Sequence, residues 1–293
     1  NTANNSGGGI GLKDDANINA SNLTISENIA EGLGGGLYIN NADPALSFAL
    51  ITDNVASSGA GIYIRNNSEI DLTNITLANN NAGLYGGGIY ARDNSVINLL
   101  NSVLWGNNSS QVYFRSEGTE VELNVSYSIL ENNQNGVETN NNGSLNWLEG
   151  NVDSDPYFCS SSTGNYFVRE NSPCLNQGLN GNLIGYLSAG CGPVNLGPVW
   201  YVDSNGDNTS DGSLETPFET IARAVNASSD GDTIRLNPGV YIGSVDFGGK
   251  VLVLESRAFE LDDDTIIAET FFGPGPLGGN CFSLEGPEDE NVT

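Results

Sequence analysis

Apolar residues recur along the first half of the chain at a nearly constant spacing. An Ile or Leu followed three positions later by Asn occurs five times, with steps of 26, 26, 27 and 26 residues. The apolar members are Ile25, Ile51, Leu77, Leu104 and Leu130, and the Asn members are Asn28, Asn54, Asn80, Asn107 and Asn133. Stretches between them, such as 70–77, alternate apolar and polar residues, which is typical of a β-strand with one buried face. The pattern predicts strands arranged in repeats.

A glycine-rich signal marks a second point in each repeat. Triplets of Gly or Ala end directly before Ile10, Leu37, Ile62 and Ile89, and Tyr stands at positions 38, 63, 90 and 113. Glycine tolerates positive φ, so it suits a sharp corner between strands. Repeats with two or three strands and no helical pattern predict a parallel β-helix, in which equivalent side chains of successive coils stack about 4.8 Å apart. A leucine-rich repeat is the alternative, but it needs a denser Leu pattern and a helical back.

Stacking of coils predicts two ladders. The five apolar residues of the repeat are expected to form one interior ladder. The five Asn residues, Asn28 to Asn133, are expected to form a structural Asn ladder of stacked side-chain amides at a turn. Leu77 is therefore placed inside the solenoid, whereas Ser95 is placed in an exposed turn.

The repeat motifs resemble those of known surface proteins. The GGGIY and Ile/Leu-x-x-Asn motifs are similar to the GGA(I/L/V) and FxxN repeats of polymorphic outer-membrane proteins, and to bacterial surface and secreted proteins with pectate-lyase-like β-helices. Residues 101–107 resemble a late coil of those proteins, and 153–158 with 171–174 resemble the segment after their last coil. The resemblance implies an all-β, right-handed parallel β-helix. It leaves the function open, because this fold hosts lyases, hydrolases, adhesins and structural fibres.

The composition changes near residue 199, where the start of a solenoid is indicated. Thr216, Pro217 and Glu219 have the order of a helix N-terminus, which predicts one short amphipathic capping helix over 217–227. Its expected apolar face comprises Phe218, Ile221, Ala222 and Val225. Strands are expected at 200–202, 233–236, 240–242 and 250–254.

The expected organisation places the beginning of a solenoid after its end. Residues 1–150 are predicted to form coils, 151–198 a Cys-containing cap or linker, and 199–293 a capping helix with first coils that continue into the next unit. No capping signal precedes Gly7, so an open strand edge is expected there and another near Leu284. A neighbouring or tandem unit could cover these edges head to tail, a circularly permuted chain could close on itself, or the chain could be truncated. We expect the first arrangement, which generates a filament.

Charge and composition exclude several function classes. With 9 basic and 36 acidic residues the net charge is −27, which argues against contacts with nucleic-acid phosphates or anionic lipid. The chain has no His, so His-dependent triads and His metal ligands are excluded. No apolar run approaches the length of a membrane span.

No residue pair has the spacing of a catalytic acid and base, so no catalytic residues are predicted. Asp262, Asp263 and Asp264 lie in a single acidic turn. Arg65, Arg92 and Arg115 fall roughly in register, as a ladder for an anionic sugar would. Pairing of these Arg residues with nearby carboxylates is the preferred interpretation.

The loop after residue 202 has oxygen-bearing side chains at alternate positions. These are Asp203, Asn205, Asp207 and Asp211, a candidate set for Ca²⁺, the only cofactor that the sequence suggests. The glycine is not at the sixth position and Leu214 occupies the twelfth, so the loop is not an EF-hand. Asx turns that cap the loop's own backbone are the favoured interpretation.

Cysteines and glycosylation triplets fit an exported chain. The disulfide candidates are Cys159, Cys174, Cys191 and Cys281. The first three share one segment, so at least one bridge is expected there, and Cys281 could pair across a subunit junction. Among the Asn-x-Ser/Thr triplets, Asn66, Asn108 and Asn142 stand in expected turns and are the best glycosylation candidates.

These features predict a non-enzymatic structural protein located outside the cell or on its surface, with itself as partner, head to tail. A stiff β-helical rod with an acidic exterior would form a fibre or an adhesin stalk. The alternatives are a polysaccharide lyase or hydrolase and a carbohydrate-binding adhesin. An aligned acidic trio on one sheet would favour the enzyme, and an exposed aromatic row would favour the adhesin.

Overall fold

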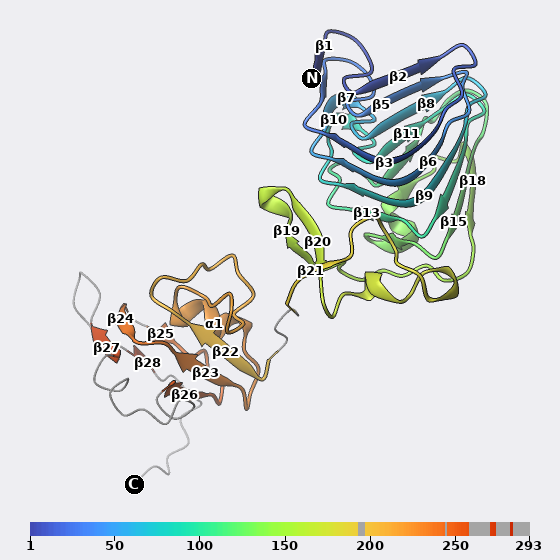
Figure 1. The fold of residues 1–293 in the computed structure, drawn as a ribbon. Coiled ribbons are helices and arrows are strands. Elements are labelled where there is room, and N and C mark those ends of the chain that lie inside the picture. The colour runs from blue at the N-terminus through green and yellow to red at the C-terminus, as the bar shows by residue number, and fades with distance from the viewer. Residues whose placement is uncertain (193–196, 244, 258–269, 274–281, 284–293) are drawn as a thin grey trace. The chain divides into compact units, whose positions relative to one another are not determined.

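The computed structural model describes residues 1–192, 197–243, 245–257, 270–273 and 282–283. The chain divides into two compact units, Asn1–Pro193 and Val194–Thr293, which are described separately (Figure 1). The first unit contains the repeats, and the second contains the short helix.

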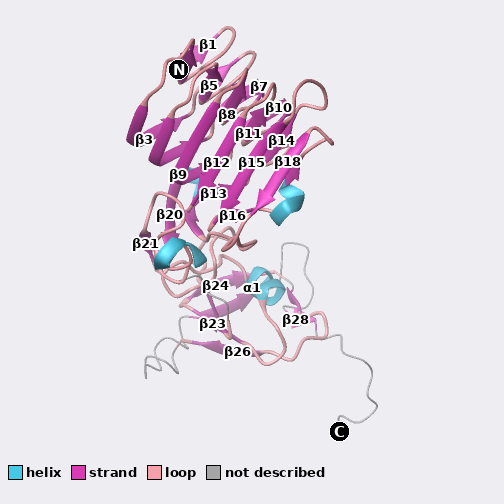
Figure 2. Ribbon diagram, turned by 90° about the vertical axis from the view of Figure 1, so that its right-hand side faces the viewer, coloured by secondary structure: helices cyan, strands magenta, loops and turns pink. Residues whose placement is uncertain are grey.

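The first unit is a parallel β-solenoid whose sheets run along its length (Figure 2). A four-stranded sheet contains β1 (Thr2–Ala3), β4 (Ile29–Ala30), β7 (Val55–Ser58) and β10 (Asn81–Tyr85). A six-stranded sheet contains β2 (Ile10–Lys13), β5 (Leu37–Asn40), β8 (Ile62–Arg65), β11 (Ile89–Ala91), β14 (Val112–Phe114) and β17 (Val137–Glu138). An eight-stranded sheet contains β3 (Asn19–Ser26), β6 (Ala45–Thr52), β9 (Glu69–Ala78), β12 (Val96–Leu100), β13 (Val103–Trp105), β15 (Val121–Ser126), β16 (Ile129–Leu130) and β18 (Gly143–Trp147). The predicted all-β solenoid is confirmed.

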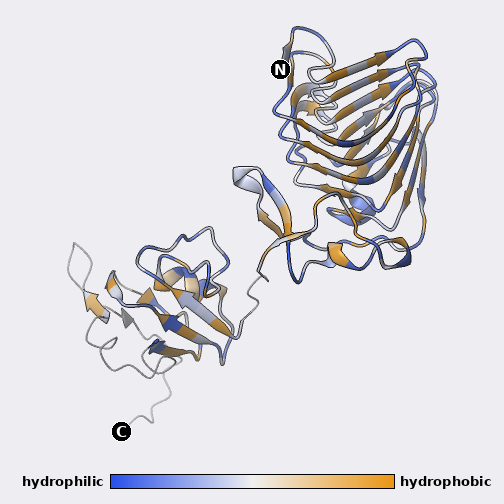
Figure 3. Ribbon diagram, in the orientation of Figure 1, coloured by the Kyte–Doolittle hydropathy of each residue, from blue (hydrophilic) through white to orange (hydrophobic). Residues whose placement is uncertain are grey.

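The predicted interior ladder is also confirmed. In parallel register, Ile25 pairs with Ile51, Ile51 with Leu77, and Leu77 with Leu104, and Leu104 pairs with Leu130. All five side chains are buried in one hydrophobic core. The alternation of apolar and polar residues along each strand is visible in the hydropathy colouring (Figure 3).

The Gly-rich corner brings neighbouring coils into close contact. A Cβ atom on Gly35 would lie 2.6 Å from the carbonyl oxygens of both Val55 and Ala60, so no larger residue fits there. The first residues of three triplets, Gly34, Gly59 and Gly86, have φ of 67°, 61° and 62°. Glycine adopts this left-handed conformation without steric cost, which explains why the triplets recur.

Another residue with a left-handed backbone conformation recurs once per coil, at a bend within or between the strands of the eight-stranded sheet. The residues at this bend are Asn22, Phe48, Asn74, Asn101 and Tyr127, with φ of 54°, 52°, 53°, 49° and 47°. Asn tolerates positive φ because its short amide bonds to the local backbone. At Phe48 and Tyr127 an aromatic residue adopts positive φ in place of Asn.

Residues 158–191, which we call the side strap, lie along the outside of the solenoid. Tyr166 Oη donates to Asp53 Oδ2 over 2.7 Å, and the Tyr186 N–H donates to Thr76 Oγ1 over 3.0 Å. Asn74 Nδ2 donates to the Leu183 carbonyl over 2.7 Å. The segment expected to be a cap or linker, 151–198, thus runs back along the coils and belongs to the first unit as far as Pro193.

The side strap and the last coil also contain short elements. These are β19 (Phe158–Ser160), β20 (Asn165–Arg169), β21 (Ala189–Cys191), and the 3₁₀ turns η1 (Asn133–Gly136), η2 (Ser161–Thr163), η3 (Pro173–Leu175) and η4 (Leu179–Gly181). β19 pairs antiparallel with β20, and β20 pairs parallel with β21.

The second unit also contains parallel strand pairs. β22 (Val199–Val202), β23 (Thr233–Leu236) and β26 (Val253–Ser256) form one sheet. β24 (Gly239–Ile242) pairs with β27 (Thr270–Gly273), and β25 (Val245–Asp246) pairs with β28 (Phe282–Ser283). The strand expected at 250–254 begins instead at Val253.

The capping helix begins four residues later than predicted. α1 spans Ile221–Ala227, and its N-cap is Thr220, whose side chain accepts the Arg223 N–H. Phe218 instead forms a bridge with Val202, because its backbone bonds to Tyr201. Ile221, Ala224 and Val225 are buried in the core of this unit, whereas Ala222 is exposed.

A charge placed in the interior ladder should destabilise the first unit strongly. In Leu77→Asp an unpaired carboxylate would lie between Ile51 and Leu104, at a cost of several kcal/mol. We expect the melting temperature measured by circular dichroism to fall by about 10 °C or more.

Ser116→Asp is the control, because Ser116 is exposed. Ser95, predicted to lie in an exposed turn, is buried at 1% exposure, and its Oγ donates to the Arg92 carbonyl. Equal melting temperatures for the Leu77 and Ser116 variants would contradict the coil register.

Candidate functional site

The predicted Asn ladder runs through the turn between the eight- and four-stranded sheets. Asn28 Nδ2 donates to Asn54 Oδ1, Asn54 Nδ2 to Asn80 Oδ1, and Asn80 Nδ2 to Asn107 Oδ1, each over 2.9 Å. The Asn80 amide also donates to the Ile51 carbonyl and accepts the Asn54 N–H. The ladder satisfies buried backbone groups at the corner, so its role is structural.

Asn133 is not part of the ladder, contrary to the prediction. It is exposed and lies in η1 with φ of 56°. Asn107 Nδ2 donates instead to Gln111 Oε1 over 2.7 Å, and Gln111 Nε2 donates to Glu131 Oε2 over 2.7 Å. Gln111 directly precedes Val112, where the other repeats have the last residue of the Gly-rich triplet, and its side chain takes the last hydrogen bond of the ladder.

A stack of tyrosines covers the outer face of the six-stranded sheet. Tyr38, Tyr63, Tyr90 and Tyr113 have successive ring separations of 5.6, 4.9 and 5.4 Å. Tyr85 stacks on Tyr113, and the Lys13 ammonium lies 5.4 Å from the Tyr38 ring centroid. The ring faces are occupied by one another, so the row is not an exposed aromatic platform for sugars.

Burial changes the acidity of this stack. Burial raises the pKa of Tyr90 to about 12, and the neighbouring Tyr63 adds to the shift. Burial also raises the pKa of Tyr63, although the Arg92 guanidinium opposes this shift. Both shifts favour the neutral phenols of Tyr63 and Tyr90.

Beside the tyrosines lies a basic column made of Lys13, Arg65, Arg92 and Arg115, four of the nine basic residues of the chain. The register expected for the arginines is confirmed, since the Arg92 and Arg115 N–H groups donate to the Ile64 and Ala91 carbonyls of the preceding coils. Arg92 pairs with Asp93, and Arg115 lies 3.6 Å from Glu117. Arg92 and Arg115 thus have nearby carboxylates, as the sequence analysis expected for these arginines.

The outer face of the eight-stranded sheet carries an amide ladder that the sequence analysis missed. Asn146 donates to Asn124, Asn124 to Asn98, and Asn98 to Asp71, each over 2.8 Å. Asn98 also donates to Glu69, and Asn146 to Glu122. The polar positions of the strand alternation could have revealed it.

Three carboxylates on this face, those of Glu69, Asp71 and Glu122, come close to the acidic trio that an enzyme would need. Glu69 and Glu122 are the register partners of Val96 on its two neighbouring strands, and Asp71 is the partner of Asn98. Each accepts an amide hydrogen bond, so the group is built into the ladder. Asp262, Asp263 and Asp264 lie outside the described residues.

The oxygen-rich loop folds as a series of Asx turns. The carboxylates of Asp203, Asp207 and Asp211 accept the N–H groups of Asn205, Thr209 and Ser213 over 2.8, 2.8 and 3.1 Å. Burial opposes ionisation of Asp203, but hydrogen bonds from Asn205 and Asn237 lower its pKa. The pKa of Asp207 is lowered by its bonds to the Thr209 N–H and hydroxyl. Within the described part of the chain, no three Asp, Glu or Cys side chains gather closely enough to hold a metal ion.

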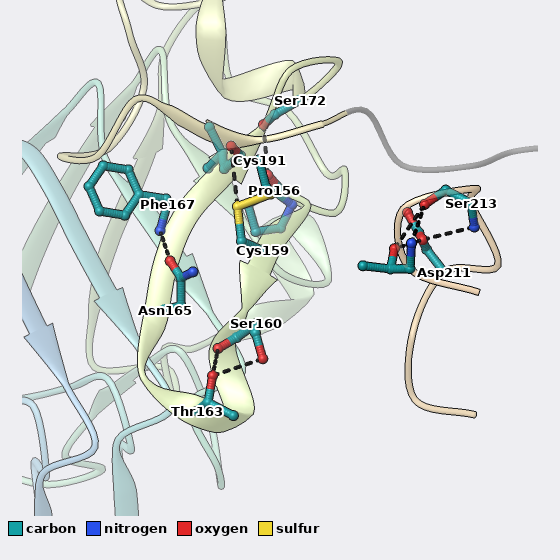
Figure 4. The surroundings of a disulfide bond; sticks show 12 residues. Pro156, Cys159, Ser160, Thr163, Asn165, Phe167, Ser172, Cys191, Asp211 and Ser213 are labelled. Carbon is teal, nitrogen blue, oxygen red and sulfur yellow. Dashed lines mark hydrogen bonds between the residues drawn. A yellow bond between two sulfur atoms is a disulfide. The ribbon is translucent and has the colours of Figure 1, made fainter. Parts of the chain in front are cut away.

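One disulfide lies in the side strap, as expected. Cys159 and Cys191 join β19 to β21 (Figure 4), and the Ser172 hydroxyl beside them donates to the Pro156 carbonyl over 2.6 Å. Cys174 is a free thiol rather than a bridge partner, and burial raises its pKa to about 12. It is packed away from the pair, next to Val168 and Ile184. Cys281 lies outside the described residues.

The glycosylation candidates differ in accessibility. Asn142 is buried and its Nδ2 donates to the Arg115 carbonyl over 2.7 Å, so the nitrogen that a glycan requires is engaged inside the fold, against the expectation. Asn66 is half-buried and Asn108 is exposed, and both stay predictions. Among the described residues, no helix has the length and apolar composition to cross a bilayer.

Stacked coils, interior columns and an Asn ladder define the class of the first unit as a parallel β-helix. The chain belongs to the right-handed β-helix family, because the family model described as a right handed beta helix region matches residues 8–172, more than half of its length. A second family model, described as a protein of unknown function (DUF1565), matches residues 204–248. Curated proteins and solved structures give no significant match.

Removing one amide from the Asn ladder should destabilise the fold. Asn80→Leu keeps the side-chain volume but leaves the Asn54 N–H and the Ile51 carbonyl without partners. Unsatisfied buried groups cost about 1–3 kcal/mol each, so the loss of two partners should lower the free energy of unfolding in urea by about 2–6 kcal/mol. Asn135→Leu, at an exposed site whose φ is not positive, is the control, and an equal loss there would contradict the ladder described above.

The tyrosine stack should make stability depend on alkaline pH. A folded-state pKa of Tyr90 near 12 means that its contribution is complete below pH 10 and is lost as the pH rises toward 12, because the unfolded chain releases the proton first. We expect Tyr90→Phe to lose less stability than the native chain between pH 10 and 12, by about 1–2 kcal/mol once solvent screening of this partly exposed phenol is allowed for. Thermal melts at successive pH values measure this, and parallel curves for the two proteins would be the contrary result.

Proposed function

We propose that the protein is a non-enzymatic structural β-helix of the cell exterior, in which units stack end to end into a fibre or adhesin stalk. The observation that carries the proposal is the strand edge of the first coil. In the described chain, β2 pairs with β5 and β3 with β6, on one side only. Such an edge presents rows of N–H and C=O groups that seek a partner.

Side-chain burial changes sharply at this edge. Ile10 and Leu23 are half-buried, whereas their partners in the next coil, Leu37 and Ala49, are fully buried. Covering the edge with another coil would bury these apolar side chains and complete the interior column. This gain in buried area favours association.

The second unit supplies an edge of the right kind. Its pairs β23–β26, β24–β27 and β25–β28 are all parallel, so β26, β27 and β28 can add to a parallel ladder in the same direction as β2 and β3. We propose that strands from residues 240–293 of one unit stack on residues 7–40 of the next. A head-to-tail contact that does not close generates a filament.

An extracellular or surface location follows from two features. The Cys159–Cys191 disulfide is typical of oxidising compartments, and the net charge of −27 would keep rods apart. The likeness of the repeats to those of polymorphic outer-membrane proteins and pectate-lyase-like proteins supports the same location. Carbohydrate binding by such a stalk is considered below, and polysaccharide cleavage is the rival function.

A charge on the coil edge should prevent stacking. We expect the full chain to form end-to-end rods in electron micrographs and to sediment faster as its concentration rises. Ile10→Lys places an ammonium on the edge that the next coil would cover, so this variant should remain monomeric with a nearly native melting temperature. Leu84→Lys, at an exposed site on β10, is the matched control and should still assemble.

Two results would overturn the structural proposal. One is a monomeric chain whose β2 and β3 amides are protected from hydrogen exchange, which would mean that the edge is covered within the chain. The other is turnover of polygalacturonate or alginate in the presence of Ca²⁺, measured as new reducing ends or unsaturated products.

A further inference from the structure

A shallow groove of about 420 Å³ lies over the outer face of β3, β6 and β9. Its polar lining comprises Asn19, Ser21, Ser47, Asp71 and Thr73. The register places these residues in two columns. Ser21, Ser47 and Thr73 form a hydroxyl column, and Asn19 and Asp71 flank Ala45 in the other.

The groove offers hydrogen-bonding groups that the fold does not use. Among the described residues, the Ser47 and Thr73 hydroxyls have no hydrogen-bond partner within the chain. Asp71 Oδ1 accepts the Asn98 amide, which fixes the carboxylate while its second oxygen stays free to accept. In contrast, neighbouring polar positions farther along the sheet are joined into the amide ladder. The groove is thus the place where this face is open to a ligand.

An exposed aromatic side chain stands next to the groove in a strained conformation. Phe48 directly follows Ser47 at the strand bend, has φ of 52°, and is 44% exposed. The adjacent coils place Asn22 and Asn74 at the same bend, and Asn is the residue that this conformation favours. A bulky residue held at positive φ is uncommon, and such strain gathers at functional sites.

The residues equivalent to Phe48 in the next two coils are polar and bond to the side strap. Asn74 donates to the Leu183 carbonyl, and Asn101 accepts the Leu179 N–H. Phe48 has no polar side-chain atom for such a bond, and it is 44% exposed. An exposed ring beside a row of hydroxyls matches the two surfaces of a pyranose, whose C–H face is apolar and whose edge carries hydroxyl groups.

We propose that this groove binds a neutral oligosaccharide. One sugar ring packs on Phe48, while its hydroxyls bond to the Ser47 and Thr73 hydroxyls and donate to the free oxygen of Asp71. The ligand is neutral because Asp71 and the nearby Glu69, in a chain of net charge −27, repel uronic acids. The site lies on a different sheet from the tyrosine stack and does not depend on end-to-end stacking.

The test is calorimetric titration of the full chain with neutral hexasaccharides of glucose, xylose, mannose, galactose and N-acetylglucosamine, with hexagalacturonate as the acidic arm. We expect at least one neutral sugar to bind, Phe48→Ala to weaken binding by tenfold or more (about 1.4 kcal/mol), and Thr73→Val to weaken it severalfold. Leu84→Ala, at an exposed apolar site on β10, should bind as the native chain does.

Phe48→Asn separates binding from structure. It restores the residue that the bend favours, so its melting temperature should equal or exceed the native value while binding falls. A variant that bound normally, binding of the acidic sugar alone, or no binding to any neutral sugar would overturn the proposal. Repeating the titration with Ile10→Lys, which should not stack, distinguishes failure of this site from failure of the fibre proposal.

Discussion

Every ordered feature of the first unit depends on the in-register pairing of parallel strands from one coil to the next. Strand spacing of about 4.8 Å places equivalent side chains in contact, so the interior column from Ile25 to Leu130, the Asn ladder and the tyrosine stack all follow from one alignment. A slip by one residue would turn each apolar side chain outward. Register is therefore both the source of stability and the constraint on sequence.

Turns absorb the differences in repeat length, so the strands keep their alignment. The apolar residue after the Gly-rich corner steps by 25 residues from Leu37 to Ile62 and by 23 from Ile89 to Val112. Leu37 nevertheless pairs directly with Ile62, and Ile89 with Val112. The cost appears at the corner of the last coils, where the Asn ladder ends. There the hydrogen-bonded series continues from Asn107 to Gln111 and from Gln111 to Glu131.

The outer faces of the solenoid carry different sets of contacts. The six-stranded sheet is closed by stacked tyrosines and by arginines that pair with local carboxylates. The bend is covered by the side strap in the coils of Asn74 and Asn101. Next to Phe48 the surface combines a groove, unused hydroxyls and an exposed aromatic residue, and this is where we propose that a sugar binds.

Periodicity in the sequence determined the fold class, the interior column and most of the Asn ladder, because a β-helix repeats its contacts at a fixed interval. Local signals were weaker guides. The Thr-Pro-Phe-Glu pattern predicted a helix from 217, but pairing of Phe218 with the strand at Val202 delays its start to Ile221. Burial of Ser95 and Asn142, the path of the side strap and the groove beside Phe48 were decided by tertiary structure alone. Each depends on which distant segment lies against a residue, and no repeat in the sequence records that contact.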